Sequence, residues 1–108
     1  MTIRETYKIF EKTSTSLEKE IDFTRSNVLK IQISGEGVCD IEVYGSLQKA
    51  DGINYEKMPI IDEKVYEIIS NITKSGIYGV YATGFKSLKI VVKNTEDTLV
   101  CVANEIVE

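Results

Sequence analysis

Apolar residues recur at every second position through most of the chain, and this period of two restricts the fold more than any other feature. Alternation of this kind surrounds Ile21, Ile41, Ile90 and Cys101, mostly with charged or polar residues between the apolar ones. It is typical of β-strands that have one face in a core and the other in water. We therefore expect an all-β protein.

Turn-forming residues separate the alternating segments at intervals of roughly 8–15 residues, a spacing typical of β-sandwiches and barrels. Glycine, asparagine, aspartate and serine gather near residues 35–37, 50–52 and 94–97. The pattern predicts an antiparallel β-sandwich, jelly-roll or immunoglobulin-like, with about eight to nine strands. The strands are expected at residues 3–10, 17–23, 28–34, 38–44, 55–61, 65–70, 77–82, 87–93 and 98–107.

Residues 62–73 carry a second pattern. Val65, Ile68, Ile69 and Ile72 recur at helical spacing after two acidic residues, as in a short amphipathic helix. The segment is also rich in β-branched residues, which favour strands. We predict a strand and a turn here, with a short helix as the alternative.

Residues 11–16 (EKTSTS) contain no apolar side chain and separate the first alternating segment from the rest. We predict an N-terminal segment of residues 1–16 and a β-sandwich domain of residues 17–108. The N-terminal segment has two interpretations: an edge strand of the same sandwich, or an arm that adds as a strand to a neighbouring subunit. As an attachment arm it would present the apolar side chains of Ile3, Tyr7, Ile9 and Phe10.

The chain has 108 residues but no His and no Trp. The missing His excludes Ser-His and Cys-His nucleophile pairs and His-containing zinc sites. Glycine-rich phosphate-binding motifs are also absent from the sequence. Paired acids remain, but Glu18 with Glu20, and Asp40 with Glu42, occupy the polar faces of predicted strands, and we interpret them as solvated rather than catalytic. We expect no enzymatic activity, no cofactor and no metal site.

The net charge of −4 argues against nucleic-acid binding, which needs a basic surface. No apolar run approaches the ~20 residues of a membrane span, and the first residues lack a signal-peptide pattern. We expect a protein made in a cytoplasm that binds neither nucleic acid nor membrane. Cys39 and Cys101 fit no metal-binding or redox spacing, and we interpret them as buried thiols, with a disulfide as the alternative.

The six tyrosines are the remaining candidates for ligand contact, because exposed aromatic rings can stack on sugars. The candidate ligand-facing aromatics are Tyr44, Tyr55 and Tyr78. Tyr44 alternates with Ile41 and Val43 and is therefore expected on the outer face of its strand. The alternative is that the rings fill the rim of the core with their hydroxyls at water, and the absence of Trp favours this alternative.

Two stretches of the sequence form a recognisable combination. The first runs through residues 41–47 (IEVYGSL) to Asp51-Gly52, Tyr55 and residues 58–60, and the second is residues 76–90 (GIYGVYATGFKSLKI). Together they resemble a β-sandwich module found in virion proteins of tailed bacteriophages. The resemblance covers about residues 28–107. It departs from the usual pattern in the first stretch, where four residues stand before Asp51-Gly52 and Tyr55 replaces a Trp.

The resemblance implies a structural role in a virion, with synthesis in the cytoplasm of a bacterial host and no catalytic site. Gly84 and Phe85 would form a structural corner, with Gly84 in a turn that a Cβ would oppose. The expected partners are the major capsid protein or other virion subunits, and further copies of the chain. A module with only a short N-terminal segment suits a stand-alone capsid decoration protein. The alternative is a glycan-binding or host-adsorption module of a phage tail tip, fibre or baseplate, because carbohydrate-binding sandwiches share parts of the pattern.

Overall fold

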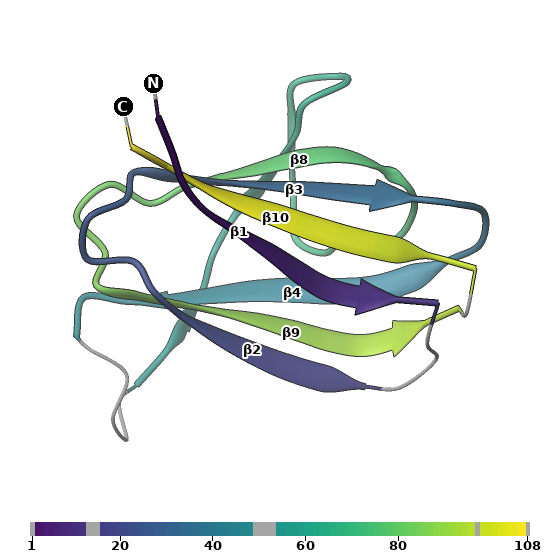
Figure 1. The fold of residues 1–108 in the computed structure, drawn as a ribbon, viewed down its shortest axis with the longest axis horizontal. Helices are drawn as coiled ribbons and strands as arrows, with labels where there is room; N and C mark the ends of the chain where they lie inside the picture. The colour runs from purple at the N-terminus through teal and green to yellow at the C-terminus, as the bar shows by residue number, and fades with distance from the viewer. Residues whose placement is uncertain (1, 13–15, 49–53, 97, 108) are drawn as a thin grey trace.

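The computed structural model describes residues 2–12, 16–48, 54–96 and 98–107. Ten β-strands form two antiparallel sheets that lie face to face (Figure 1). This architecture confirms the predicted all-β sandwich. Within the described residues there is no helix, and therefore none that could cross a membrane.

The larger sheet has six strands in the order β1-β10-β3-β8-β6-β7, so β1 and β7 are its two edges. Its strands are β1 (Thr2–Glu11), β3 (Val28–Ser34), β6 (Ile60–Asp62), β7 (Glu67–Ile69), β8 (Gly76–Tyr81) and β10 (Val100–Val107). The smaller sheet has four strands in the order β2-β9-β4-β5. Its strands are β2 (Leu17–Asp22), β4 (Cys39–Ser46), β5 (Glu56–Lys57) and β9 (Ser87–Thr95).

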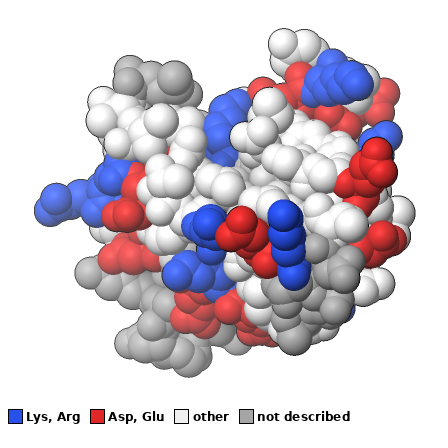
Figure 2. Space-filling view, turned by 45° about the vertical axis from the view of Figure 1, so that its right-hand side comes forward, with Lys and Arg blue, Asp and Glu red and all other residues white. Residues whose placement is uncertain are grey.

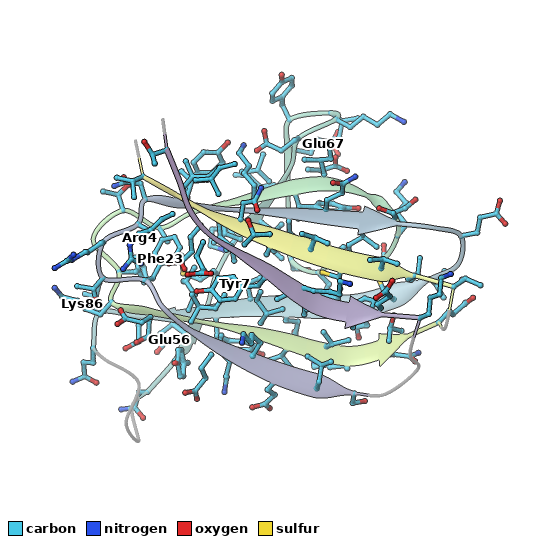
Figure 3. All side chains as sticks on the ribbon, viewed as in Figure 1. Arg4, Tyr7, Phe23, Glu56, Glu67 and Lys86 are labelled. Atoms are coloured by element: carbon cyan, nitrogen blue, oxygen red, sulfur yellow. The ribbon has the colours of Figure 1, made fainter. Side chains whose placement is uncertain are left out.

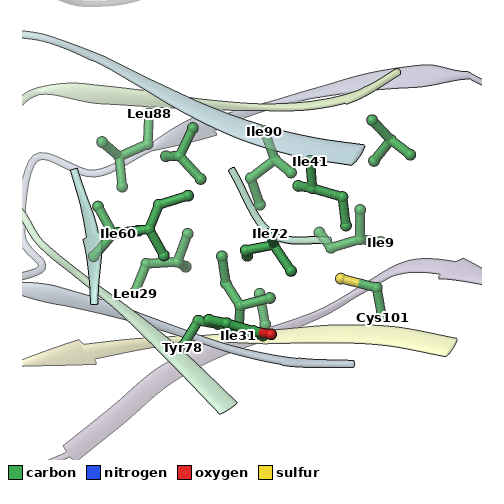
Figure 4. Packing of buried hydrophobic residues seen from close by; sticks show 14 of the residues in the cluster. Ile9, Leu29, Ile31, Ile41, Ile60, Ile72, Tyr78, Leu88, Ile90 and Cys101 are labelled. Carbon is green, nitrogen blue, oxygen red and sulfur yellow. The ribbon is translucent and has the colours of Figure 1, made fainter. Parts of the chain in front are cut away.

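The core lies between the two sheets and consists of the inward-facing residues of the alternating segments. Figure 4 shows Leu88, Ile90 and Ile41 of the smaller sheet facing Leu29 and Ile31 of the larger one. All five side chains have no exposed surface. Burying a side chain of this size contributes about 1.5–3 kcal/mol, so the period-two pattern supplies the main stabilisation of the fold.

The single strand predicted at residues 55–61 is wrong, because the structure has two strands there in different sheets. β5 pairs with β4 in the smaller sheet, whereas β6 pairs with β7 and β8 in the larger one. Pro59 lies between them and has no N–H group to donate to a strand ladder. Met58 and Ile60, on either side of it, are buried, so the chain crosses between the sheets at this point.

The structure favours the strand-and-turn prediction for residues 62–73 over the helix. Residues 63–66 form a turn that joins β6 and β7 into a hairpin. Ile72 then exchanges two backbone hydrogen bonds with Ile41 of β4, at 2.8 and 3.0 Å. Ile69 packs against the core and Ile72 lies in it, while Ile68 points to solvent. The helical spacing therefore arises from residues on both faces of the sheet.

The N-terminal segment occupies the edge position that one of its two interpretations predicts. β1 pairs with β10 of the same chain, from Thr2 opposite Val107 to Glu11 opposite Val100. In Figure 1, β1 and β2 form the near edges of the two sheets, and the two chain ends lie side by side. The segment thus completes the larger sheet of its own sandwich.

Candidate interaction surfaces

The predicted attachment residues of β1 differ strongly in exposure. Ile9 and Phe10 are buried in the chain's own core, whereas Tyr7 is half-buried and Ile3 is 57% exposed. The register with β10 shifts between Lys8 and Phe10, and such a bulge allows two consecutive side chains to point inward. The structure therefore corrects the prediction for Ile9 and Phe10, which would have to leave the core to reach a partner.

Glu105 of β10 forms a buried polar cluster that the sequence analysis missed. Its side chain is 1% exposed and accepts hydrogen bonds from the Tyr7 hydroxyl and, at 2.9 Å, from the Ser26 hydroxyl. Arg4 Nη1 lies 3.5 Å from the same carboxylate. Burial and the bond to Glu105 raise the pKa of Tyr7, so the phenol remains a hydrogen-bond donor.

The alternation along β10 is the sequence signal that points to this cluster. Cys101, Ala103 and Glu105 occupy every second position and all face inward. Figure 3 labels Arg4, Tyr7 and Phe23 near one another at the end of the sandwich where β1 begins. A carboxylate at an inward position needs partners, since an unpaired buried charge is strongly unfavourable. Here β1 supplies two of them, so the cluster fastens β1 to β10.

Tyr44 lies on the outer face of the smaller sheet within a network of charges. Its hydroxyl donates to Glu42 Oε1 at 3.2 Å. Lys57 and Lys93 each place their ammonium nitrogen 2.7 Å from the Glu42 carboxylate. Hydrogen bonds from these two lysines lower the pKa of Glu42 to about 2. Glu42 is therefore ionised at neutral pH and pairs with both lysines.

Lys89 brings two of the three predicted ligand-facing aromatics together. Its Nζ atom lies 5.8 Å from the centre of the Tyr44 ring and 4.8 Å from the centre of the Tyr55 ring. These are cation–π distances. Both rings are half-buried, and burial raises the pKa of Tyr55. The arrangement is a mixed aromatic and cationic surface, in which the one ammonium group of Lys89 lies near both rings.

Tyr78, the third predicted ligand-facing aromatic, belongs to the core. Its side chain is 2% exposed, and its hydroxyl donates to the Lys74 carbonyl at 2.8 Å. Tyr78 and Val80 share the inward face of β8, whereas Ile77 and Tyr81 point outward. The prediction that Tyr78 faces a ligand is therefore wrong. The alternation alone could not decide which of the two tyrosines in this strand would be buried.

The predicted corner at Gly84 and Phe85 lies between β8 and β9. Gly84 has a φ of +90°, in the region that favours glycine. The Phe85 N–H donates to the Ala82 carbonyl at 3.0 Å, and the Phe85 ring packs against the core. A Cβ on Gly45 would come within 2.9 Å of this ring. The close approach of Phe85 therefore requires glycine at position 45 of β4.

The β6–β7 hairpin projects from the larger sheet, at the top of Figure 1, and carries exposed apolar side chains. Val65 is 54% exposed, Tyr66 82% and Ile68 72%. Ile77 of β8 is 51% exposed on the same outer face. We call these four residues the hairpin surface. Sequence pattern does not indicate that these residues are exposed, because the apolar residues of a strand or of an amphipathic helix are expected to face the core.

The turn at the tip of the hairpin has an unusual backbone. Tyr66 has a φ of +58°, which is uncommon for a bulky residue. Its N–H donates to the Asp62 carbonyl at 2.7 Å, and the Asp62 carboxylate accepts the Lys64 N–H at 3.0 Å. These two hydrogen bonds hold the turn closed and direct the Tyr66 ring into solvent.

Glu63 fixes the hairpin to the neighbouring strands. Its carboxylate accepts the Tyr81 hydroxyl at 2.8 Å and lies 3.0 Å from Lys30 Nζ. Lys30 also donates to the Tyr81 oxygen at 2.9 Å. A Cβ on Gly79 would lie 2.5 Å from the Glu63 carboxylate, so this glycine makes room for the contact. The triad of Glu63, Lys30 and Tyr81 thus sets the angle of the hairpin.

Charges of both signs are interspersed over the face shown in Figure 2, with wide uncharged areas between them. Across the part of the chain that the structure describes, no three His, Cys, Asp or Glu side chains are grouped as metal ligands. Cys39 and Cys101 are free and buried. Burial raises the pKa of Cys39 to about 11 and that of Cys101 to about 12, so both thiols stay protonated at neutral pH.

Comparisons with known proteins concern the fold alone. No protein-family model matches the chain, and no curated protein matches its sequence. The Asp51-Gly52 pair of the virion-module motif lies outside the described residues. Among solved structures, the chain is similar to the crystal structure of SPBc2 prophage-derived protein YomS, with a TM-score of 0.74 and 15% sequence identity. The match covers 94% of this chain and 90% of that chain, so the two share a fold over nearly their whole lengths.

Proposed function

We propose that the protein is a non-enzymatic structural protein of a bacteriophage virion, and specifically a capsid decoration protein that binds the assembled shell and stabilises it. The observation that carries the proposal is the nearly full-length fold match to a prophage-derived protein. The resemblance of residues 41–60 and 76–90 to a virion β-sandwich module gives it further support. The partner is then the major capsid protein or another virion subunit.

The physical character of the domain suits this role. A net charge of −4 disfavours self-aggregation before the protein reaches a particle. A shell presents the same surface many times, and a decoration protein that contacts neighbouring subunits adds binding energy across their junctions. Contacts that are weak singly become strong in such an array, because the second contact forms at a high effective concentration.

Purified particles test the proposal. In the phage or prophage that encodes this chain, we expect the protein in many copies per particle by mass spectrometry, with antibody label over the head. Particles from a deletion strain should release DNA at a lower temperature, and adding back the purified protein should restore the wild-type temperature. Absence of the protein from purified particles would contradict the proposal.

The second candidate is a glycan-binding or host-adsorption module of a tail tip, fibre or baseplate. The observation that favours it is the group formed by Tyr44, Tyr55 and Lys89, which offers aromatic carbon and polar atoms on one surface. A glycan array with Tyr44→Ala as the control variant tests it. Binding that Tyr44→Ala removes would support this function, as would antibody label confined to the tail. Absence of binding to every sugar would count against it.

A further inference from the structure

The hairpin surface, formed by Val65, Tyr66, Ile68 and Ile77, is an apolar patch that projects from the larger sheet. All four side chains are more than half exposed. Contiguous apolar patches on soluble domains mark interaction sites. A shallow groove along the edge of β7, lined in part by Pro59 and Ile68, continues this patch.

The backbone of Tyr66 gives an independent reason to regard the tip as functional. A φ of +58° is a conformation that glycine adopts without strain and that bulky residues avoid. The ring is 82% exposed, so it contributes little to the core of its own chain. Neither backbone preference nor burial explains an aromatic residue here. Strained positions of this kind gather at binding sites.

The hairpin is also held ready for contact. Glu63 is joined to Lys30 of β3 at 3.0 Å and to Tyr81 of β8 at 2.8 Å. Two hydrogen bonds to Asp62 close the turn itself. An element that is already ordered loses less conformational entropy on binding. The tip is therefore a rigid projection that can bind a partner without first becoming ordered.

The size and charge of the surface indicate the kind of partner. Four partly exposed side chains offer on the order of a few hundred Å² of apolar area, whereas a stable isolated complex buries about 800 Å² on each partner. The contact therefore suits a surface that is presented many times rather than a dimer of this chain. The Tyr66 ring stands among charged residues of the same hairpin: Lys64 and Glu67 are its neighbours, and Glu63 is paired with Lys30. The complementary pocket is therefore apolar at its centre and polar at its rim.

We infer that the tip of the β6–β7 hairpin inserts into an apolar pocket of a repeated virion subunit, with the Tyr66 ring as the central anchor. This inference rests on the proposed function and names the attachment surface. It places attachment at the opposite edge of the larger sheet from β1.

The test measures co-sedimentation of purified protein with particles from the deletion strain. Tyr66→Gly removes the ring and keeps the left-handed backbone, so its thermal unfolding should match the wild type. We expect its binding to particles to be weaker by about tenfold or more. Val38→Ser is the matched control, since Val38 is a 58% exposed apolar residue in the β3–β4 connection. Its binding should equal that of the wild type.

Each outcome separates the inference from the proposed function. If the wild type and Tyr66→Gly bind particles equally, the hairpin is not the attachment surface, while the proposed function stands. If the wild type does not bind particles at all, both fail. If sedimentation velocity shows a wild-type dimer that Tyr66→Gly converts to a monomer without loss of particle binding, the surface joins two copies of this chain and the inference is overturned.

Discussion

The two edges of the larger sheet differ in almost every physical respect. β1 has ten residues, pairs along its length with β10 and places Ile9 and Phe10 in the core. β7 has three residues, pairs with β6 and exposes Ile68 to water. The bulges and charged side chains of β1 also discourage pairing with other chains. The edge with the longer strand is thus integrated into its own fold, and the shorter edge presents the apolar surface.

The largest difference in stability between the two edges is expected when an aromatic ring is removed from β1. Phe10→Ala should lower the free energy of unfolding by about 3–5 kcal/mol, because it leaves a cavity in the core. Urea denaturation measures the change. Ile3→Ala, at an exposed position of the same strand, is the control and should change stability by less than ~0.5 kcal/mol. Equal effects of the two variants would mean that β1 is not anchored through the core.

A second test addresses the polar cluster beneath β1. Glu105→Ala should destabilise the protein by about 2–3 kcal/mol, because the Tyr7 and Ser26 hydroxyls lose their acceptor and Arg4 loses its counter-charge. Hydrogen exchange should show the loss first in the amides of β1, with β7 unaffected. Glu5→Ala, which removes an exposed acid of β1, should have no such effect. Uniform loss of protection over both edges would remove the distinction between them.

Alkaline pH should weaken the attachment of β1 to β10. The folded protein raises the pKa of Tyr7 above its ordinary value of 10.0, through burial and the bond to Glu105. The contribution of Tyr7 is therefore complete below pH 10 and is lost as the pH rises from there towards the folded pKa. We expect a loss of about 1 kcal/mol per pH unit above 10. Denaturation curves from pH 8 to 11 measure it. Tyr7→Phe should make the slope shallower, and the raised pKa values of Cys39 and Cys101 keep the remaining pH dependence in both proteins. An equal slope in the variant would contradict this assignment.

The smallest effect on stability is expected at the tip of the hairpin. Tyr66→Gly removes an aromatic ring, as Phe10→Ala does, but the ring is exposed and glycine relieves the left-handed backbone. The free energy of unfolding should change by less than ~1 kcal/mol. Thermal denaturation of both variants in one buffer makes the comparison direct. A large loss in Tyr66→Gly would show that the tip stabilises the fold.

Alternation predicts the strands well because each one lies between core and water. The predicted strand at residues 28–34 coincides with β3, and the outward position of Tyr44 follows from the same parity. Parity does not reveal where a strand changes sheets, as at Pro59. It also fails at Phe10, because the bulge at Ile9 shifts the phase by one residue and both side chains are buried.

Exposure at the hairpin depends on which elements cover each face, and this information is not local. Ile68 and Ile69 are adjacent and both apolar, yet Ile69 packs against the core while Ile68 points to water. Successive side chains of a strand point to opposite faces of the sheet, and the packing of the two sheets decides which of these faces is buried. The cluster at Glu105 depends likewise on tertiary neighbours, since two of its partners lie on β1, about a hundred residues away along the chain.

The ribosome produces β1 long before β10, its partner strand, which begins at Val100. β10 also separates β1 from β3, so the two early strands cannot pair with each other in the native order. During synthesis of the intervening residues, Ile9 and Phe10 are therefore exposed on an unpaired strand. Unpaired strands with apolar side chains are the parts of nascent chains most prone to aggregation. We therefore expect residues 2–11 to be prone to aggregation until β10 has left the ribosome.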